Sequence, residues 1–229
     1  MKEYPKINSL WKREGWYFDE KKKKDPAYQK GKQSFIIGDY ACPEFGNIKT
    51  WHVEEKIDGT NIRVHVDKDM KVRFGGRTSR ALLPAHLLEV LQDTFTLSVM
   101  KMVFMDEENT MPDVTLYGEG YGPKIQATGK LYRDDPGFCL FDVRVGSWWL
   151  MRDDVDTIAN KLGVPCAPFL GYMAEDEIVE FVKSKPLSRC SQEEQVMEGV
   201  ICRPSPLMLY RNGHPIMWKL KTREFNQGD

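Results

Sequence analysis

The chain has 229 residues, of which 41% are hydrophobic and 29% are charged, and this composition is typical of one large or two small folded domains. Its 33 Lys and Arg residues balance 34 Asp and Glu residues, so the formal net charge of −1 excludes the strongly basic proteins that bind nucleic acid through their overall field. The charge is nevertheless uneven, because residues 1–32 carry +5 and residues 33–229 carry −6.

The sequence favours a soluble protein with a cytoplasmic location and no membrane partner. It contains no run of about 18 apolar residues, and it begins without an apolar signal core. The five cysteines are odd in number, lie far apart and form no Cys-x-x-Cys pair, which argues against a disulfide framework and a thiolate zinc site. The four histidines are equally scattered, so we do not expect a histidine metal site.

The predicted elements begin with strands. Apolar and polar residues alternate over residues 51–66, and this period of two predicts half-buried strands on either side of a turn at 56–61. Residues 72–74 predict a further strand, which we expect Gly75-Gly76 to break. Leucines at helical spacing between residues 82 and 103 predict the longest helix of the chain.

The second half of the chain alternates between strands and shorter helices. Strands are predicted at 114–117, 138–145, 148–150, 196–203 and 217–220. Helices are predicted at about 153–162, before the stop signal Gly163, and at about 175–183. Strands with helices inserted between them predict an α+β fold built on antiparallel sheets around one core.

The most informative cluster is Lys56-Ile57-Asp58-Gly59-Thr60-Asn61, in which a lysine lies between two predicted strands and a glycine permits a tight turn. A lysine amine is a nucleophile only without its proton, so burial or neighbouring cations must favour its neutral form. The cations available for this are Arg77, Arg80, Lys219 and Lys221. Taken alone, the cluster is equally compatible with an ordinary hairpin turn.

This cluster is the first of six that follow one another in a fixed order, each at or near a predicted strand. The six are Lys56-Ile57-Asp58-Gly59, Arg77-Thr78-Ser79, Tyr117-Gly118-Glu119, Leu140-Phe141-Asp142-Val143, Glu198-Gly199-Val200 and Lys219-Leu220-Lys221. Over residues 51 to 225 this series resembles the motifs of the covalent nucleotidyltransferases, which include polynucleotide ligases and capping enzymes. The run from Gly118 to Gln126 and the Thr-Asn pair after Gly59 are most similar to nick-sealing RNA ligases of the RNA ligase 2-like branch. The resemblance implies an ATP-grasp-like adenylation domain over residues 51–229.

The resemblance also implies an ATP-dependent RNA ligase that joins a 5′-phosphate to a 3′-hydroxyl end. Lys56 would attack the α-phosphate of ATP to form lysyl-AMP, AMP would pass to the 5′-phosphate of the polynucleotide, and the 3′-hydroxyl would displace it. Each step is an in-line displacement at phosphorus, where catalysis depends on positioning and on cancellation of charge. Lys219 and Lys221 are alternate residues of one predicted strand, so both would reach the α-phosphate from the same face.

The other cluster residues receive roles from the same resemblance. The expected nucleotide contacts are Glu55 at the adenine edge, Glu119 on the ribose hydroxyls, Phe141 and Val200 on the two faces of the base, and Asn61 and Arg77 on ribose or phosphate. The carboxylates expected to hold Mg²⁺ or Mn²⁺ are Asp58 and Glu198, with Asp142 as a lesser candidate. The structural alternatives are solvated surface charges for the polar residues and plain core packing for the two apolar ones.

Both ends of the chain differ from the pattern of such enzymes. Only eight residues follow Lys221, so we expect no appended C-terminal domain, and a protein partner would have to supply one. Residues 1–50 are expected to form a basic, aromatic N-terminal extension that either contacts the polynucleotide or packs over the sheet. Its aromatic residues include Trp11, Trp16, Tyr17 and Tyr28.

Two other functions stay open at this stage. A DNA nick ligase would share the first chemical step, and only the 2′-hydroxyl of the strand that ends in the 3′-hydroxyl distinguishes the two substrates. A nucleic-acid end-binding module that has lost catalysis is disfavoured, because the lysines and acids of every cluster are still present.

Overall fold

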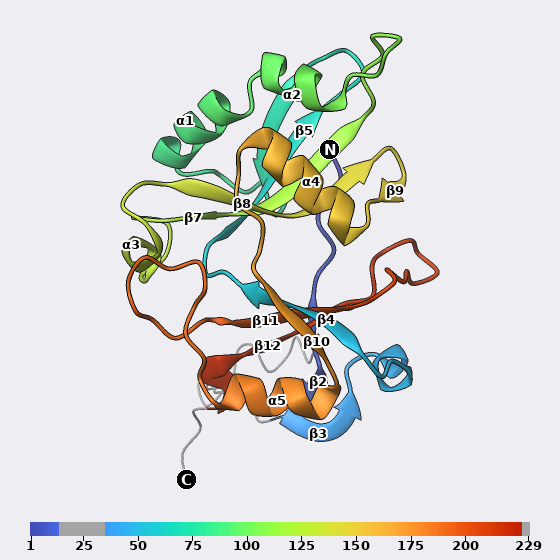
Figure 1. The fold of residues 1–229 in the computed structure, drawn as a ribbon, viewed down its shortest axis with the longest axis vertical. Helices are drawn as coiled ribbons and strands as arrows, with labels where there is room; N and C mark the ends of the chain where they lie inside the picture. The colour runs from blue at the N-terminus through green and yellow to red at the C-terminus, as the bar shows by residue number, and fades with distance from the viewer. Residues whose placement is uncertain (14–34, 226–229) are drawn as a thin grey trace, which may run out of the picture.

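The structure, a computed structural model that describes residues 1–13 and 35–225, contains two five-stranded sheets and one two-stranded sheet (Figure 1). The upper sheet in Figure 1 has the strand order β6-β5-β7-β8-β9, and the lower sheet has the order β1-β12-β11-β4-β10. Neighbouring strands run antiparallel except β1 and β12. The predicted α+β class with antiparallel sheets is confirmed.

The upper sheet carries its three longer helices on one face. Its strands are β5 (Thr60–Val66), β6 (Val72–Gly76), β7 (Val114–Tyr121), β8 (Gly137–Val145) and β9 (Trp148–Trp149). The helices are α1 (Ala85–Thr94), α2 (Leu97–Phe104), α4 (Arg152–Leu162) and the short α3 (Gly129–Tyr132). Alternate strand residues such as Val64 and Leu116 are fully buried with Leu91 of α1 and Val155 of α4 in one apolar core.

The lower sheet has its own apolar core on the face that α5 (Glu175–Lys183) covers. Its strands are β1 (Asn8–Ser9), β4 (Trp51–Lys56), β10 (Phe169–Met173), β11 (Gly199–Pro204) and β12 (Trp218–Lys221). The paired strands β2 (Trp11–Arg13) and β3 (Phe35–Tyr40) and the 3-10 helices η2 (Pro43–Asn47) and η3 (Thr222–Phe225) surround it. Trp51 and Trp218 meet in this core with ring centroids 5.2 Å apart.

The predicted long helix is wrong, because residues 82–103 form two helices. Leu82 lies outside both and is 96% exposed, and the chain turns at Phe95 and Thr96. The Thr96 side chain accepts a hydrogen bond from the Val99 amide at 3.3 Å, so it caps the start of α2. The apolar spacing continues through the break because both helices face the same core.

The structure differs from the prediction in two smaller features, the glycines of β6 and a strand at the edge of the lower sheet. Gly75 and Gly76 do not break β6 but pair with Arg63 and Ile62 of β5. The sequence did not predict β10, a strand at the edge of the lower sheet whose pairing with β4 shifts register at Gly171. Irregular edge strands of this kind lack the strict alternation that makes a strand visible in a sequence.

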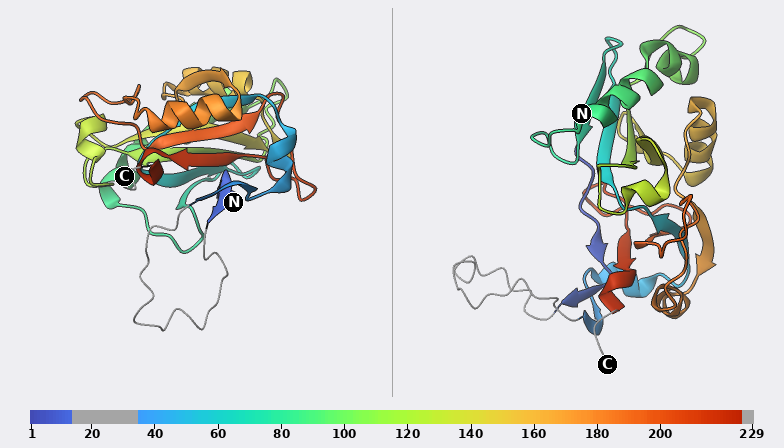
Figure 2. Two further views of the ribbon diagram at one scale, coloured as in Figure 1. Left: turned by 90° about the horizontal axis from the view of Figure 1, so that it is seen from below. Right: turned by 90° about the vertical axis from the view of Figure 1, so that its left-hand side faces the viewer.

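Residues 1–13 pack against both sheets. The chain begins beside the upper sheet and runs down to the lower one, where β1 pairs with β12 (Figures 1 and 2). Leu10 and Trp11 are buried in the lower core. The predicted nucleic-acid contacts at Trp16, Tyr17 and Tyr28 lie outside the described residues. No helix within the described ranges is long and apolar enough to cross a membrane.

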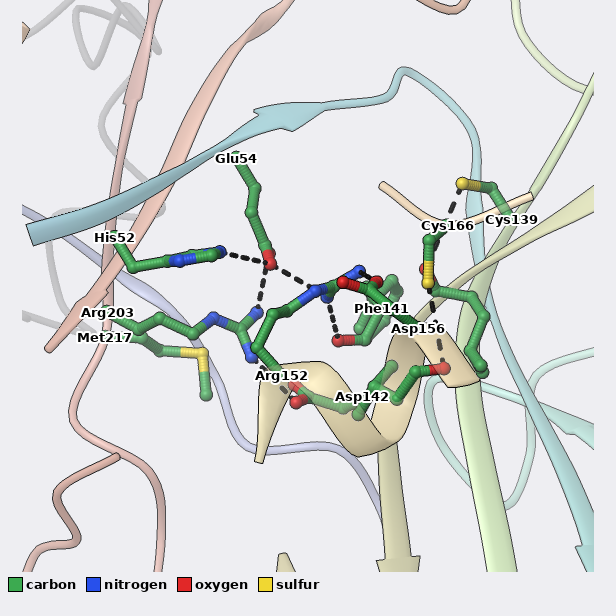
Figure 3. A network of polar contacts seen from close by, with 12 residues as sticks. His52, Glu54, Cys139, Phe141, Asp142, Arg152, Asp156, Cys166, Arg203 and Met217 are labelled. Carbon is green, nitrogen blue, oxygen red and sulfur yellow. Dashed lines mark hydrogen bonds and ion pairs between the residues drawn. The ribbon is translucent and has the colours of Figure 1, made fainter. Parts of the chain in front are cut away.

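A buried network of charges joins the two sheets (Figure 3). Glu54 of β4 lies between Arg203 of β11 and Arg152 of α4, with N···O distances of 3.1 and 2.8 Å. Arg203 also contacts Asp142 of β8 at 2.7 Å. The network therefore pairs lower-sheet residues with groups that belong to the upper sheet and its helix.

The charges in this network stabilise one another. Burial alone would raise the pKa of Glu54, but Arg203 and Arg152 more than offset this and lower it to about 2. Burial disfavours the charged form of Arg203, yet Asp142 and Glu54 raise its pKa. Loss of one member would leave a buried charge without its counterion, which is far more costly than loss of an exposed ion pair.

We expect Glu54→Gln to lower the free energy of unfolding by about 3–5 kcal/mol, because Arg152 loses its buried counterion and Arg203 loses one of its two. The matched control is Asp156→Asn, which removes a 48% exposed partner of Arg152 and should cost about 0–1 kcal/mol. Denaturant unfolding at pH 7 measures both, and equal small losses would contradict the role of the network. Since the folded pKa of Glu54 is the lowered one, its contribution is complete above about pH 4.5 and is lost as the pH falls toward 2.

Candidate functional site

A cavity of about 310 Å³ lies between the two sheets, and Glu54 and Arg203 of the buried charge network line it. The lower sheet contributes Lys56, Ile201, Arg203 and Lys219 to the lining, and the upper sheet contributes Asn61, Glu119 and Phe141. Tyr4, Pro5 and Ile7 of the N-terminal segment complete one side. Residues from clusters far apart in the sequence thus meet in one cavity.

Lys56 is the last residue of β4 and lies beside a carboxylate that a second lysine shares. Its Nζ is 2.5 Å from Oε2 of Glu198, and Nζ of Lys221 is 2.5 Å from Oε1 of the same carboxylate. Gly199, at φ +156°, pairs with both lysines, and a Cβ there would lie 2.0 Å from the Leu220 carbonyl oxygen. Glycine at this position therefore permits the close approach that brings the three charged groups together.

Lys219 and Lys221 lie on the same face of β12, as the alternation of a strand requires. Their neighbours Trp218 and Leu220 are buried in the opposite, lower core. Burial lowers the pKa of Lys219 to about 8, and the charges of Lys221 and Lys56 act in the same direction. Burial and the neighbouring cations both disfavour the charged form of Lys219, and an anionic ligand would offset both effects.

The two glutamates of the site differ in protonation. Burial would raise the pKa of Glu198, but the ammonium groups of Lys56 and Lys221 more than offset this and lower it. Burial raises the pKa of Glu119 to about 8; the charge of Lys56 opposes this, and the negative charges of Glu198 and Asp58 add to it. Near neutral pH, Glu198 therefore accepts hydrogen bonds from lysines, while Glu119 carries a proton that it can donate.

Contacts from residues 126–132 fix the turn after Lys56. The hydroxyl of Tyr132 accepts from the Asp58 amide at 3.1 Å, and Nε2 of Gln126 donates to the Gly59 carbonyl at 2.9 Å. Thr128 donates to the Asp58 carboxylate at 3.2 Å. The turn is thus an anchored part of the site, which an ordinary exposed hairpin turn would not be.

The sequence profile of the RNA ligase family matches residues 49–220, which include Lys56, Glu119, Glu198 and Lys219 and end one residue before Lys221. This chain belongs to the RNA ligase family. No curated protein sequence matches it.

Solved structures with the same fold include the RNA ligase of Naegleria gruberi. The structure of that ligase with PPi is 17% identical, with a TM-score of 0.56 over 77% of this chain and 50% of the other. A mutant of it with AMP and Mn is 18% identical, with a TM-score of 0.58 over 80% of this chain and 53% of the other. A mutant with ATP and Mn is 17% identical, with a TM-score of 0.56 over 77% of this chain and 50% of the other. This family member therefore spans about half of the length of those chains.

The cavity of this RNA ligase family member contains most of the residues expected from the sequence. Those that line it are Lys56, Glu55, Asn61, Arg77, Glu119, Phe141 and Lys219. Glu198 and Lys221 lie next to it through their contacts with each other and with Lys56. The Glu55 carboxylate accepts from Ser188 at 2.5 Å and from the Arg189 amide at 2.7 Å, so it anchors that loop.

Two expected roles do not fit the structure. Val200 is fully buried in the lower core, and the next residue of β11, Ile201, lines the cavity, so the strand alternation is shifted by one residue relative to the prediction. Asp142 is not available for a metal ion, because one carboxylate oxygen contacts Arg203 and the other accepts from the Tyr4 hydroxyl.

Asp58 and Glu198 are the remaining metal candidates. Within residues 1–13 and 35–225, no group of three or more His, Cys, Asp or Glu side chains is arranged to hold a metal ion. Mg²⁺, however, keeps several waters and needs only one or two carboxylates when phosphates supply further oxygens. Asp58 lies in the turn after Lys56 and Glu198 contacts Lys56, so these two carboxylates are the ones that would hold such an ion.

Tyr4 is a site residue that the sequence did not predict. Its ring is packed at centroid distances of 5.0 Å from Phe141 and 5.1 Å from Tyr117, and its hydroxyl donates to Asp142. It therefore holds the Phe141 ring at the edge of the cavity. The only signal in the sequence was the general richness of the N-terminal residues in aromatics.

The titration of Glu119 tests the electrostatics of the site without any ligand. We expect the side-chain carboxyl carbon of Glu119 to titrate near pH 8 in ¹³C NMR, with Glu119→Gln providing the assignment. Glu198→Gln should lower this midpoint, because it removes a negative charge that disfavours ionisation of Glu119. A midpoint of about 4.5, the value of an exposed glutamate, would contradict the burial of this carboxyl group.

Proposed function

We propose that this protein is an ATP-dependent RNA ligase that forms lysyl-AMP at Lys56 and uses it to join a 5′-phosphate to a 3′-hydroxyl end. The observation that carries the proposal is the convergence of Lys56, Lys219 and Lys221 at one cavity, with Glu198 between two of them. Three cations around one position suit the non-bridging oxygens of a phosphate. Placement in the RNA ligase family and the fold shared with a ligase studied with ATP and Mn support it.

The rest of the cavity suits an adenosine. Phe141 and Ile201 supply apolar surface from the two sheets, where the flat base would lie. The side-chain oxygen of Asn61 is buried without a hydrogen-bond partner, so a ribose hydroxyl could donate to it. Glu119, protonated near neutral pH, lies on the same side as a further ribose contact. Arg77 is exposed and offers a planar fork to phosphate oxygens at the rim.

The first step follows from these positions. A bond forms between Nζ of Lys56 and the α-phosphorus, and the bond from that phosphorus to the pyrophosphate oxygen breaks, so pyrophosphate leaves with the electron pair. The attacking amine must first lose a proton, and Oε2 of Glu198, 2.5 Å away, is placed to receive it. Lys219 and Lys221 offset the negative charge of the α-phosphate. Mg²⁺ or Mn²⁺ held through Asp58 or Glu198 would supply further charge neutralisation.

We expect wild-type protein incubated with Mg²⁺ and α-labelled ATP to keep the label after denaturation, while Lys56→Ala keeps none. Lys219→Ala and Lys221→Ala should each slow labelling by about 10²–10³-fold, because each removes a phosphate-binding cation. Lys183→Ala is the control, since this lysine is 44% exposed and lies outside the cavity. Labelled GTP and NAD⁺ should give no adduct. Persistence of the adduct in Lys56→Ala, or its absence from wild type, would remove the proposed chemistry.

The nature of the polynucleotide is tested with nicked duplexes whose 3′-hydroxyl strand ends in either ribose or deoxyribose. We expect faster sealing when the end is ribose, because only RNA offers the 2′-hydroxyl as a donor and acceptor. Both substrates carry the same 5′-phosphate strand, so any difference arises at the 3′-hydroxyl side. Equal rates would contradict a specific RNA ligase and favour a general nick ligase.

A further inference from the structure

A second cavity, of about 150 Å³, adjoins the proposed nucleotide cavity. Ile7 and Lys219 line both cavities. The rest of its lining comes from residues 6–13 and Ala41. We call this second cavity the basic groove, and its four basic lining residues are Lys6, Lys12, Arg13 and Lys219.

Strand pairing explains why basic residues gather at this place. β1 runs parallel to β12 at the edge of the lower sheet, with Ser9 opposite Lys219. Leu10 is fully buried and Trp11 is 4% exposed, so the segment is fixed in the lower core on one side. Its basic side chains consequently remain beside the lysine strand of the site.

Among residues 1–13 and 35–225, the lining of the basic groove contains four basic residues and no acidic residue. Two carboxylates outside the lining hold its side chains: Asp39 contacts Lys12 at 2.7 Å, and Glu224 accepts from Arg13. The pair between Lys12 and Asp39 is about half exposed on both sides, and exposed pairs of this kind are weak. An anion in the groove would therefore meet a positive surface in which Lys12 and Arg13 are already oriented.

The size of the groove selects the kind of anion. A volume of about 150 Å³ is half that of the neighbouring cavity and is too small for a nucleoside, whereas ligand pockets usually exceed about 300 Å³. A phosphate group fits this volume and takes charge-assisted hydrogen bonds from lysine and arginine. The groove also lies directly beside the lysine that would hold the α-phosphate.

We propose that the basic groove binds a second phosphate group of a substrate, next to the phosphate that reacts at Lys56. This inference rests on the proposed function, since it places the groove relative to that reaction. The phosphate comes either from the pyrophosphate portion of ATP or from the backbone of the polynucleotide. Both sources present the same chemistry to Lys6, Lys12 and Arg13, and they act in different steps of the reaction.

The test compares the double variant Lys6→Gln/Lys12→Gln with the matched control Lys49→Gln/Lys183→Gln. Both remove two positive charges from exposed lysines, and Lys183 resembles Lys12 because it is 44% exposed and 2.7 Å from its partner Glu180. The control lysines lie outside both cavities. A third variant, Lys6→Arg/Lys12→Arg, keeps the charge and should restore function if charge is what matters.

Two reactions separate the sources. Formation of the labelled adduct as a function of ATP concentration reports on the pyrophosphate portion, and sealing of a pre-adenylylated strand without ATP reports on the polynucleotide. We expect the groove variant to raise KM at least about tenfold in one of the two reactions, while the control changes it less than about twofold. If the polynucleotide is the source, the salt dependence of sealing should also become shallower, by about one unit of log–log slope for each lost phosphate contact.

The outcomes separate failure of the groove proposal from failure of the ligase proposal. A raised KM for ATP assigns the groove to the pyrophosphate portion, and a raised KM for the pre-adenylylated strand assigns it to the backbone. If the groove variant and the control behave alike in both reactions while wild type forms the adduct, the groove proposal is overturned and the ligase proposal stands. If wild type forms no adduct, the ligase proposal fails, and the groove proposal fails with it.

Discussion

The buried ion pairs between Glu54, Arg203, Asp142 and Arg152 hold the two sheets in a fixed relation, and the site depends on that relation. Charged groups leave water at a high cost, which these four offset by facing one another. Glu54 and Lys56 are alternate residues of β4 and share a face. The network that fixes Glu54 therefore also fixes the direction from which Lys56 enters the cavity.

In the central strands of the lower sheet, the side chains on one face lie in the apolar core and those on the other face line the cavity. In β11, Val200 and Cys202 belong to the core, while Ile201 and Arg203 line the cavity. In β12, Trp218 belongs to the core and Lys219 to the cavity. Apolar packing on one face of the sheet thus supports the charged groups on the other face. Because these groups lie on packed strands, their positions do not depend on loops.

What could be predicted from the sequence follows from the range of the interactions. Alternation in β4 and β12 is a local pattern, so the shared face of Lys219 and Lys221 was predictable. The break at Thr96 was not, because two helices that face one core continue the same apolar spacing. The hydrogen bond of Tyr4 to Asp142 spans 138 positions, and no local pattern reports a contact of that kind.

Glu198 gives the site a defined charge state before any ligand arrives. Lys56 and Lys221 would repel each other without it, and its carboxylate lies 2.5 Å from both amines. Under the proposed function, a phosphate entering beside Lys219 would compete with this carboxylate for the same cations. If the phosphate draws Lys221 away from Glu198, the carboxylate loses one of the two cations that lower its pKa and becomes a better base while it still contacts Lys56.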